Sequence, residues 1–305
     1  MLDAFWGKIS EALGSRWASS LYQPAWLVAL VGMGAWISRQ ESASGAIKAL
    51  GQSLPSPEIR WIAALVLLVA MLSAAELVRG AQNWLLRLME GYWPDALRSR
   101  HTERVRARLQ KHRERWQQLD GTSRNRERWE FVRLDRKVIK LHPPQDSELM
   151  PTALGNRLRA AEQHSHARYG LDAVTAFPRL WPLLPDCLRE DLAESREGLN
   201  AAVRLFAWGL LSLVWCLWAW WVVLIAVAMM WIAWRRVLDA AEAYGDLLRA
   251  SFDLYRFDLY RALRWPLPSD TETERAHGER LTVYLYRGLT SPEVVFTEEK
   301  TEPAG

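Results

Sequence analysis

The chain has 305 residues, half of them hydrophobic, with 18 Trp and a formal net charge of +4 at pH 7. Because the mean hydropathy is nevertheless only -0.15, the apolar residues are expected to gather in blocks that charged segments separate. The small net charge argues against a dedicated nucleic-acid binder, and the spacing of Cys187 and Cys216 suits neither a disulfide framework nor a zinc site.

Two apolar segments in the first part of the chain are candidate membrane crossings. A helix of about 20 apolar residues crosses a hydrocarbon core of about 30 Å. Residues 24–38 reach that length only when residues 19–22 are added, whereas residues 61–78 come close to it alone. Both lack a polar face, which favours a crossing over a buried core helix. Residues 1–18 carry apolar side chains at helical spacing and predict an interfacial helix, the alternative being a signal peptide cleaved after residues 42–44.

Residues 205–234 form an apolar run that contains no charged residue. As one helix it would be about 45 Å long, which exceeds the hydrocarbon core and requires a strong tilt. Trp residues at both ends and in the middle suggest three positions at an interface, and therefore a hairpin. Arg204 before the run, and Arg235 and Arg236 after it, favour placing both ends on the cytoplasmic side. The alternative is a single crossing, because residues 216–219 lack the usual turn residues.

A basic segment, residues 98–140, follows the second candidate crossing. Lys and Arg far outnumber Asp and Glu there, and an apolar stripe at helical spacing predicts an amphipathic helix. Basic residues next to a membrane attract anionic headgroups by roughly 1 kcal/mol each. We therefore expect anionic lipid as the partner of this segment, with nucleic-acid binding as the less favoured alternative.

The next region carries clear helix signals. Pro151 and Thr152 predict a helix start, and Gly170 predicts its end. Residues 178–185 contain three prolines around apolar side chains, which predicts a broken segment resting at the membrane face. Asp186 is expected to cap the helix that leads into the apolar run.

Beyond the apolar run, the pentapeptide FDLYR occurs twice in tandem within a predicted helix. We expect ion pairs between Asp253 and Arg256 and between Asp258 and Arg261, because each pair is three residues apart. The charged side chains either pack against other charged helices or form local pairs on a solvated face. The candidate helix-pairing charges are Arg249, Asp253, Arg256, Asp258 and Arg261. Residues 282–286 predict a last short helix or strand.

Three longer motifs stand out: LHPPQDSELMPTALGNRLRAAE, RYGLDAVTAFPRLWPLLP and YGDLLRASFDLYRFDLYRALRWPLP. Together they resemble a group of uncharacterised bacterial multi-pass inner-membrane proteins, and the resemblance covers residues 100–288. It implies a bacterial inner-membrane location and carries over no activity and no functional residue.

The sequence contains no HExxH, GxSxG or phosphate-binding glycine loop, so we expect no catalytic residue, metal site or cofactor. A polar helix face is the remaining candidate for binding a ligand or partner, with structural pairing as the alternative. Its members are Asn156, Arg159, Glu162, Asp172 and Arg179.

The predicted fold is an all-α polytopic membrane protein with four transmembrane helices in two hairpins and a helical cytosolic domain. The expected segments are an interfacial helix at 1–18, transmembrane hairpins at 19–80 and 201–236, a basic region at 81–145, helical cytosolic regions at 146–200 and 237–289, and a disordered acidic tail at 290–305. The predicted function is non-enzymatic self-association, as a homo-oligomer, or docking of a cytosolic protein. The alternatives are an oligomeric channel or membrane-permeabilising effector, and a membrane-bound enzyme acting on lipid.

Overall fold

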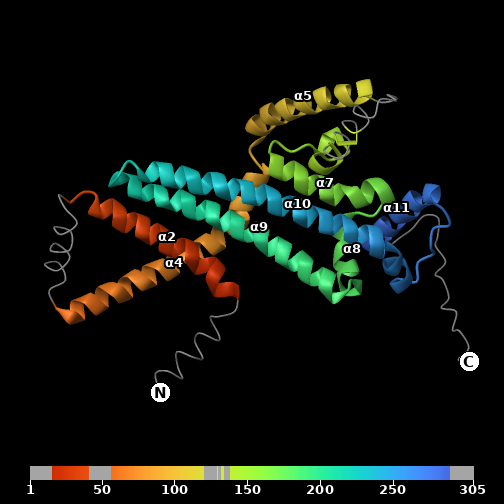
Figure 1. Cartoon of the computed structure of the whole chain (residues 1–305). Coiled ribbons are helices and arrows are strands. Elements are labelled where there is room, and N and C mark those ends of the chain that lie inside the picture. The colour runs from red at the N-terminus through yellow and green to blue at the C-terminus, as the bar shows by residue number, and fades with distance from the viewer. Residues whose placement is uncertain (1–15, 41–55, 120–128, 130–131, 134–137, 289–305) are drawn as a thin grey trace, which may run out of the picture. The chain divides into compact units, whose positions relative to one another are not determined.

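The computed structural model describes residues 16–40, 56–119, 129, 132–133 and 138–288, and this part of the chain is helical (Figure 1). The longer helices are α2 (Arg16–Ile37), α4 (Pro57–Glu90), α5 (Asp95–Leu119), α7 (Ala153–Tyr169), α8 (Ala173–Leu180), α9 (Asp186–Ser212), α10 (Val222–Ala262) and α11 (Thr271–Arg287). Three short 3-10 turns are η1 (Asp146–Glu148), η2 (Trp181–Leu183) and η3 (Leu213–Leu217). The predicted acidic tail and most of the predicted interfacial helix lie outside the described residues.

The chain divides into two compact units. Unit 1 consists of Met1–Arg87 and Gly198–Val237, and unit 2 consists of Leu88–Glu197 and Leu238–Gly305. The three apolar segments that the sequence singles out, residues 24–38, 61–78 and 205–234, therefore fall in unit 1, and the charged helical regions fall mainly in unit 2.

Within the described ranges, two helices are long and apolar enough, by length and composition, to span a membrane: Pro57–Glu90, and the stretch Asp186–Leu217 formed by α9 and η3. Ala25–Ile37 is a shorter apolar helix. Four spanning helices were predicted, whereas two helices among the described residues are long and apolar enough to span a membrane. The apolar start of α10 is interrupted by Arg235 and Arg236 before it reaches the roughly 20 residues that a membrane crossing requires.

The apolar run of residues 205–234 is interrupted by a turn in unit 1. Helix α9 ends at Ser212, η3 follows, and α10 begins at Val222. The turn is closed by backbone hydrogen bonds, because the amides of Trp218 and Ala219 both donate to the carbonyl of Trp215, at 2.9 and 3.1 Å. No glycine or proline is needed for this turn, which explains why the usual turn signals are missing from the sequence.

The core of unit 2 is formed by the facing sides of α7, α8, α10 and α11, with the beginning of α9. Its largest buried side chains include Phe252 and Tyr260. Leu180 and Leu184 are also buried there. The proline-containing segment around them therefore packs into unit 2, and its position at a membrane face stays a prediction.

The predicted limits of α7 are confirmed. The hydroxyl oxygen of Thr152 accepts a hydrogen bond from the amide of Gly155 at 3.0 Å, as expected for an N-cap. Gly170 ends the helix with φ of 71°, in the left-handed region that favours glycine.

The last helix is longer than expected, because α11 covers Thr271–Arg287 instead of residues 282–286 alone. Asp270 caps it, accepting a hydrogen bond from the amide of Thr273 at 2.7 Å. At Gly278 the helix backbone comes so close to α7 that an added Cβ would lie 1.8 Å from the carbonyl oxygen of Tyr169. This close approach between two backbones positions α11 in unit 2.

Candidate functional site

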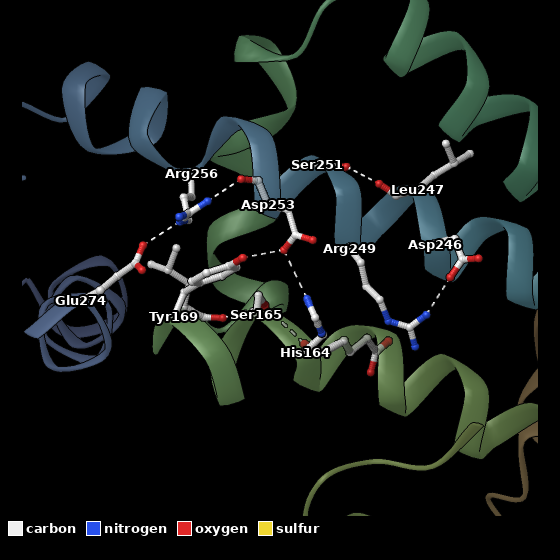
Figure 2. A network of polar contacts seen from close by, with 12 residues as sticks. His164, Ser165, Tyr169, Asp246, Leu247, Arg249, Ser251, Asp253, Arg256 and Glu274 are labelled. Carbon is white, nitrogen blue, oxygen red and sulfur yellow. Dashed lines mark hydrogen bonds and ion pairs between the residues drawn. The ribbon is translucent and has the colours of Figure 1, made fainter. Parts of the chain in front are cut away.

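A network of polar contacts in unit 2 joins α7 to α10 (Figure 2). The Asp253 carboxylate of α10 accepts a hydrogen bond from the Tyr169 hydroxyl at 2.6 Å. It also lies 3.2 Å from Nε2 of His164. Figure 2 shows the carboxylate of Asp253 placed between these two side chains of α7. One half-buried carboxylate therefore connects two helices that are distant in the sequence.

Arg256 extends the network to α11. Its Nε donates to Oε1 of Glu274 at 2.6 Å, and its Nη1 donates to the backbone carbonyl of Asp253. The guanidinium also stacks over the ring of Tyr169, 4.2 Å from the centroid. The predicted pairing of the Asp253 and Arg256 side chains is therefore wrong, because each charged group is used by a different helix.

Burial determines the protonation of this network. It lowers the pKa of His164, against the hydrogen bond and the charge of Asp253, which act in the opposite direction. His164 is consequently neutral at pH 7 and donates from Nε2 to the carboxylate. Burial, followed by the hydrogen bond to Asp253, raises the pKa of Tyr169 to about 12, so its hydroxyl keeps its proton.

An imidazole beside a carboxylate is also a component of catalytic triads, but a nucleophile is required as well. The nearby Ser165 donates its hydroxyl proton to the carbonyl of Leu171 at 2.8 Å. It is buried and 1 % exposed. Ser165 therefore stabilises the end of α7 through this hydrogen bond. The contacts of Asp253 and Arg256 connect α7, α10 and α11.

A second charged cluster ties α10 to the segment that precedes α7. Lys140 pairs with Asp246, and Arg249 lies 3.0 Å from the same carboxylate. Arg249 also donates to the carbonyl of Lys140 at 3.3 Å. Glu242, one turn earlier in α10, lies 3.9 Å from Arg157 of α7. The sequence analysis names Arg249 as a candidate helix-pairing charge. It places Lys140 in the basic segment and does not predict its contacts with α10.

The predicted polar face on α7 is divided into two parts. Asn156 is 1 % exposed, and its amide bonds both the N–H and the carbonyl of Met150, at 2.9 and 2.7 Å. It therefore closes the loop before α7. Arg159 does not join this contact; it forms ion pairs with Glu148 and Glu162, at 3.5 and 3.4 Å. Burial raises the pKa of Glu162, and Arg159 opposes that effect.

The remaining candidate residues are involved in local contacts. The Asp172 carboxylate caps α8 by accepting from the amide of Thr175 at 3.0 Å. Arg179 donates to the carbonyl of Thr175 at 2.6 Å and is exposed. Asp258 and Arg261 form the predicted pair, at 2.8 Å, on the surface of α10. These residues are not brought together into one site.

An open cavity of about 580 Å³ lies in unit 2, between α7, α8 and the end of α11. Its charged or titratable lining residues are Glu148, His166, Asp172, Tyr286 and Arg287. Across the described ranges, no group of three or more His, Cys, Asp or Glu could hold a metal ion. The cavity thus has a lining of mixed charge.

Comparisons with protein-family models, curated proteins and solved structures found no match to this chain. The resemblance to bacterial inner-membrane proteins therefore remains a prediction that rests on the three quoted motifs.

Proposed function

We propose that the chain is a non-enzymatic integral membrane protein, anchored by unit 1, that works through self-association or partner docking by unit 2. The observation that carries the membrane part is the exposure of the first half of α4. Leu65, Val66, Leu67, Leu68 and Val69 are consecutive and between 47 % and 62 % exposed. Consecutive helical positions differ by about 100°, so these side chains cover the whole circumference. Lipid is the solvent that such a helix requires.

Alkaline carbonate extraction of membranes from cells that express the full chain tests the anchor. The wild type is expected to stay in the membrane pellet. Leu67→Arg is expected to lower the membrane-bound yield, because a charge at the centre of a spanning helix costs about 3 kcal/mol on insertion. Val174→Arg is the matched control, since Val174 is 70 % exposed but lies on α8 of unit 2. Quantitative release of the wild type by carbonate would contradict the anchor.

The topology that we propose is four crossings in two hairpins, in a bacterial inner membrane, with both termini in the cytosol. Packing within unit 1 supports this, because Ala35 of α2 clusters with Ala219 and Val222 at the hairpin turn. The indole N–H of Trp221 also lies 3.5 Å from the hydroxyl of Ser38, at the end of α2. The polar end of α2 thus lies beside the turn, as expected if both are at the same interface.

The apolar start of α10 is the shortest of the four proposed crossings. Val222 to Trp234 rise about 20 Å at 1.5 Å per residue, less than a core of about 30 Å. Arg235 and Arg236 would extend toward the headgroups to compensate. Reporter fusions test the topology: a reporter after Arg236 that is active in the periplasm, with one near residue 150 inactive there, would refute it.

The docking part is supported by apolar side chains around the cavity of unit 2. Val283 and Tyr286 of α11 line the cavity and are 45 % and 79 % exposed. Val174, close in sequence to the lining residue Thr175, is exposed as well. Crosslinking and size measurement in detergent test this proposal. A strict monomer that co-purifies with no partner would count against it.

A buried polar pair in unit 1 favours an oligomeric channel as the second candidate. Arg204 of α9 is 6 % exposed and donates to Oε1 of Gln82 on α4 at 2.9 Å. Polar groups between apolar helices often mark an ion path. Ion flux in liposomes that contain the full chain tests this function, and flux that is unchanged by Arg204→Gln would remove its support.

A further inference from the structure

Helix α5 belongs to the basic segment, and the structure shows that one side of it packs within unit 2. Leu109 is 1 % exposed. On the adjoining part of the helix, Arg113 lies 2.9 Å from the Asp146 carboxylate and Arg106 lies 3.5 Å from the Asp146 carbonyl. These two arginines therefore help to hold α5 against the segment before α7.

Four other cations of α5 lie on a different side of the helix. Arg100, Arg104, Arg108 and Lys111 are all exposed. At about 100° per residue they fall within an arc of about 80°, whose middle lies roughly 140° from Leu109. None of the four has an ion pair with any residue in the described parts of the chain. We call these four residues the basic face of α5.

Acidic side chains do not neutralise the basic face from within. Glu103 and Glu114 are exposed and border one edge of it, and Ala107 lies just outside the arc on that same edge, next to the cations. Because the four cations lie along one side of a helix, they can reach a single plane together. A flat layer of negative charge is the partner that fits this arrangement.

We propose that the basic face of α5 docks on the anionic headgroups of the membrane in which α4 is anchored. This inference rests on the proposed insertion of α4. Helix α5 begins at Asp95, shortly after α4 ends at Glu90, so insertion of α4 tethers the basic face close to the bilayer. The tether raises the local concentration of headgroups. No aromatic side chain lies among the four cations, so the face lacks the stacking platform typical of single-stranded nucleic-acid sites.

Energy transfer in lipid nanodiscs measures the docking directly. Ala107→Cys, with Cys187→Ser and Cys216→Ser, places one donor dye at the border of the basic face of the full chain without replacing any of its four cations. The acceptor is a dye on lipid headgroups, in discs of phosphatidylcholine alone or mixed with phosphatidylglycerol. We expect stronger transfer in the mixed discs and a fall to the phosphatidylcholine level at high salt, because salt screens exposed charges.

Charge-removal variants assign the effect to the basic face. Changing Arg100, Arg104, Arg108 and Lys111 to Gln keeps helix propensity and is expected to reduce the anionic-lipid effect at least tenfold. The control changes four cations on other elements of unit 2 to Gln, with the same loss of charge, and is expected to retain the full effect. Its positions are Arg179, Arg261, Arg275 and Arg280.

The possible outcomes separate this inference from the proposed function. If the chain does not enter nanodiscs, the membrane anchor is refuted, and the docking with it. If the chain enters nanodiscs but transfer is equal in both lipid mixtures, only the docking is overturned. Loss of the effect in both charge-removal variants also overturns it, as does binding of an RNA oligonucleotide by the basic face without any lipid dependence.

Discussion

The ion pair between Arg256 and Glu274 provides the sharpest test of how unit 2 is held together. The Glu274 side chain is 7 % exposed and that of Arg256 is 17 % exposed. Glu274→Gln keeps the shape of the side chain but removes the charge. The largely buried guanidinium of Arg256 then loses its carboxylate partner and remains over the ring of Tyr169.

The magnitude follows from the burial of the pair. Removing one partner of a buried ion pair costs about 3–5 kcal/mol. Because the Arg256 guanidinium stacks on aromatic rings at 4.2 and 4.3 Å, cation–π attraction retains part of its stabilisation. We therefore expect a loss of about 3 kcal/mol, which corresponds to roughly a hundredfold increase in local opening.

Hydrogen exchange of the intact chain in detergent measures this opening, because α11 can open without global unfolding. Glu274→Gln is expected to accelerate exchange of the α11 amides by about two orders of magnitude. Asp258→Asn is the matched control, since Asp258 and Arg261 are 43 % and 64 % exposed and such surface pairs contribute about 0–1 kcal/mol.

A double variant separates the ion pair from general damage. Replacing Arg256 and Glu274 together by Met removes both charges, and we expect it to recover at least half of the lost protection. If Glu274→Gln changes α11 exchange no more than Asp258→Asn does, the ion pair does not hold α11, and the reasoning from burial is wrong.

Three further predictions concern unit 2. Gly278→Ala should destabilise it by about 1–3 kcal/mol in chemical denaturation, because the new Cβ would clash with the carbonyl of Tyr169. His164→Gln should remove a pH dependence of stability: burial lowers the folded-state pKa of His164, so the unfolded state binds the proton first, and the wild type loses stability as pH falls from 6.5 toward the folded pKa. Tyr260→Phe should leave the free energy of unfolding unchanged or raise it by about 1 kcal/mol, because the buried hydroxyl makes no hydrogen bond within the described residues. The thermal midpoint of unfolding measures this change.

Each of these predictions has an outcome that contradicts it. Gly198→Ala is the control for Gly278→Ala, since nothing lies within 4 Å of its added Cβ and alanine favours a helix; equal effects of the two changes would refute the clash. Parallel pH profiles for the wild type and His164→Gln would exclude His164 as the source. Strong destabilisation by Tyr260→Phe would indicate that the hydroxyl has a partner after all.

The sequence by itself located several helix limits of this protein, because these depend on neighbouring residues. Thr152 caps α7 with its own hydroxyl, and Gly170 ends that helix through its freedom at positive φ. The pair of Asp258 and Arg261 was also predictable, since it lies one turn apart on an exposed surface. The apolar run was likewise expected to contain a break, from the positions of its Trp residues.

The tertiary structure alone decided which partner each charge of the polar network uses. Asp253 was expected to pair with the local Arg256. Its carboxylate instead contacts Tyr169 and His164 of α7, and Arg256 pairs with Glu274 of α11. Helix α11 was underestimated because few of its side chains are apolar and its packing at Gly278 depends on a backbone contact with α7. Contacts between distant segments leave no periodic pattern in a sequence, so only the folded chain shows which side of a charged helix is packed and which is free.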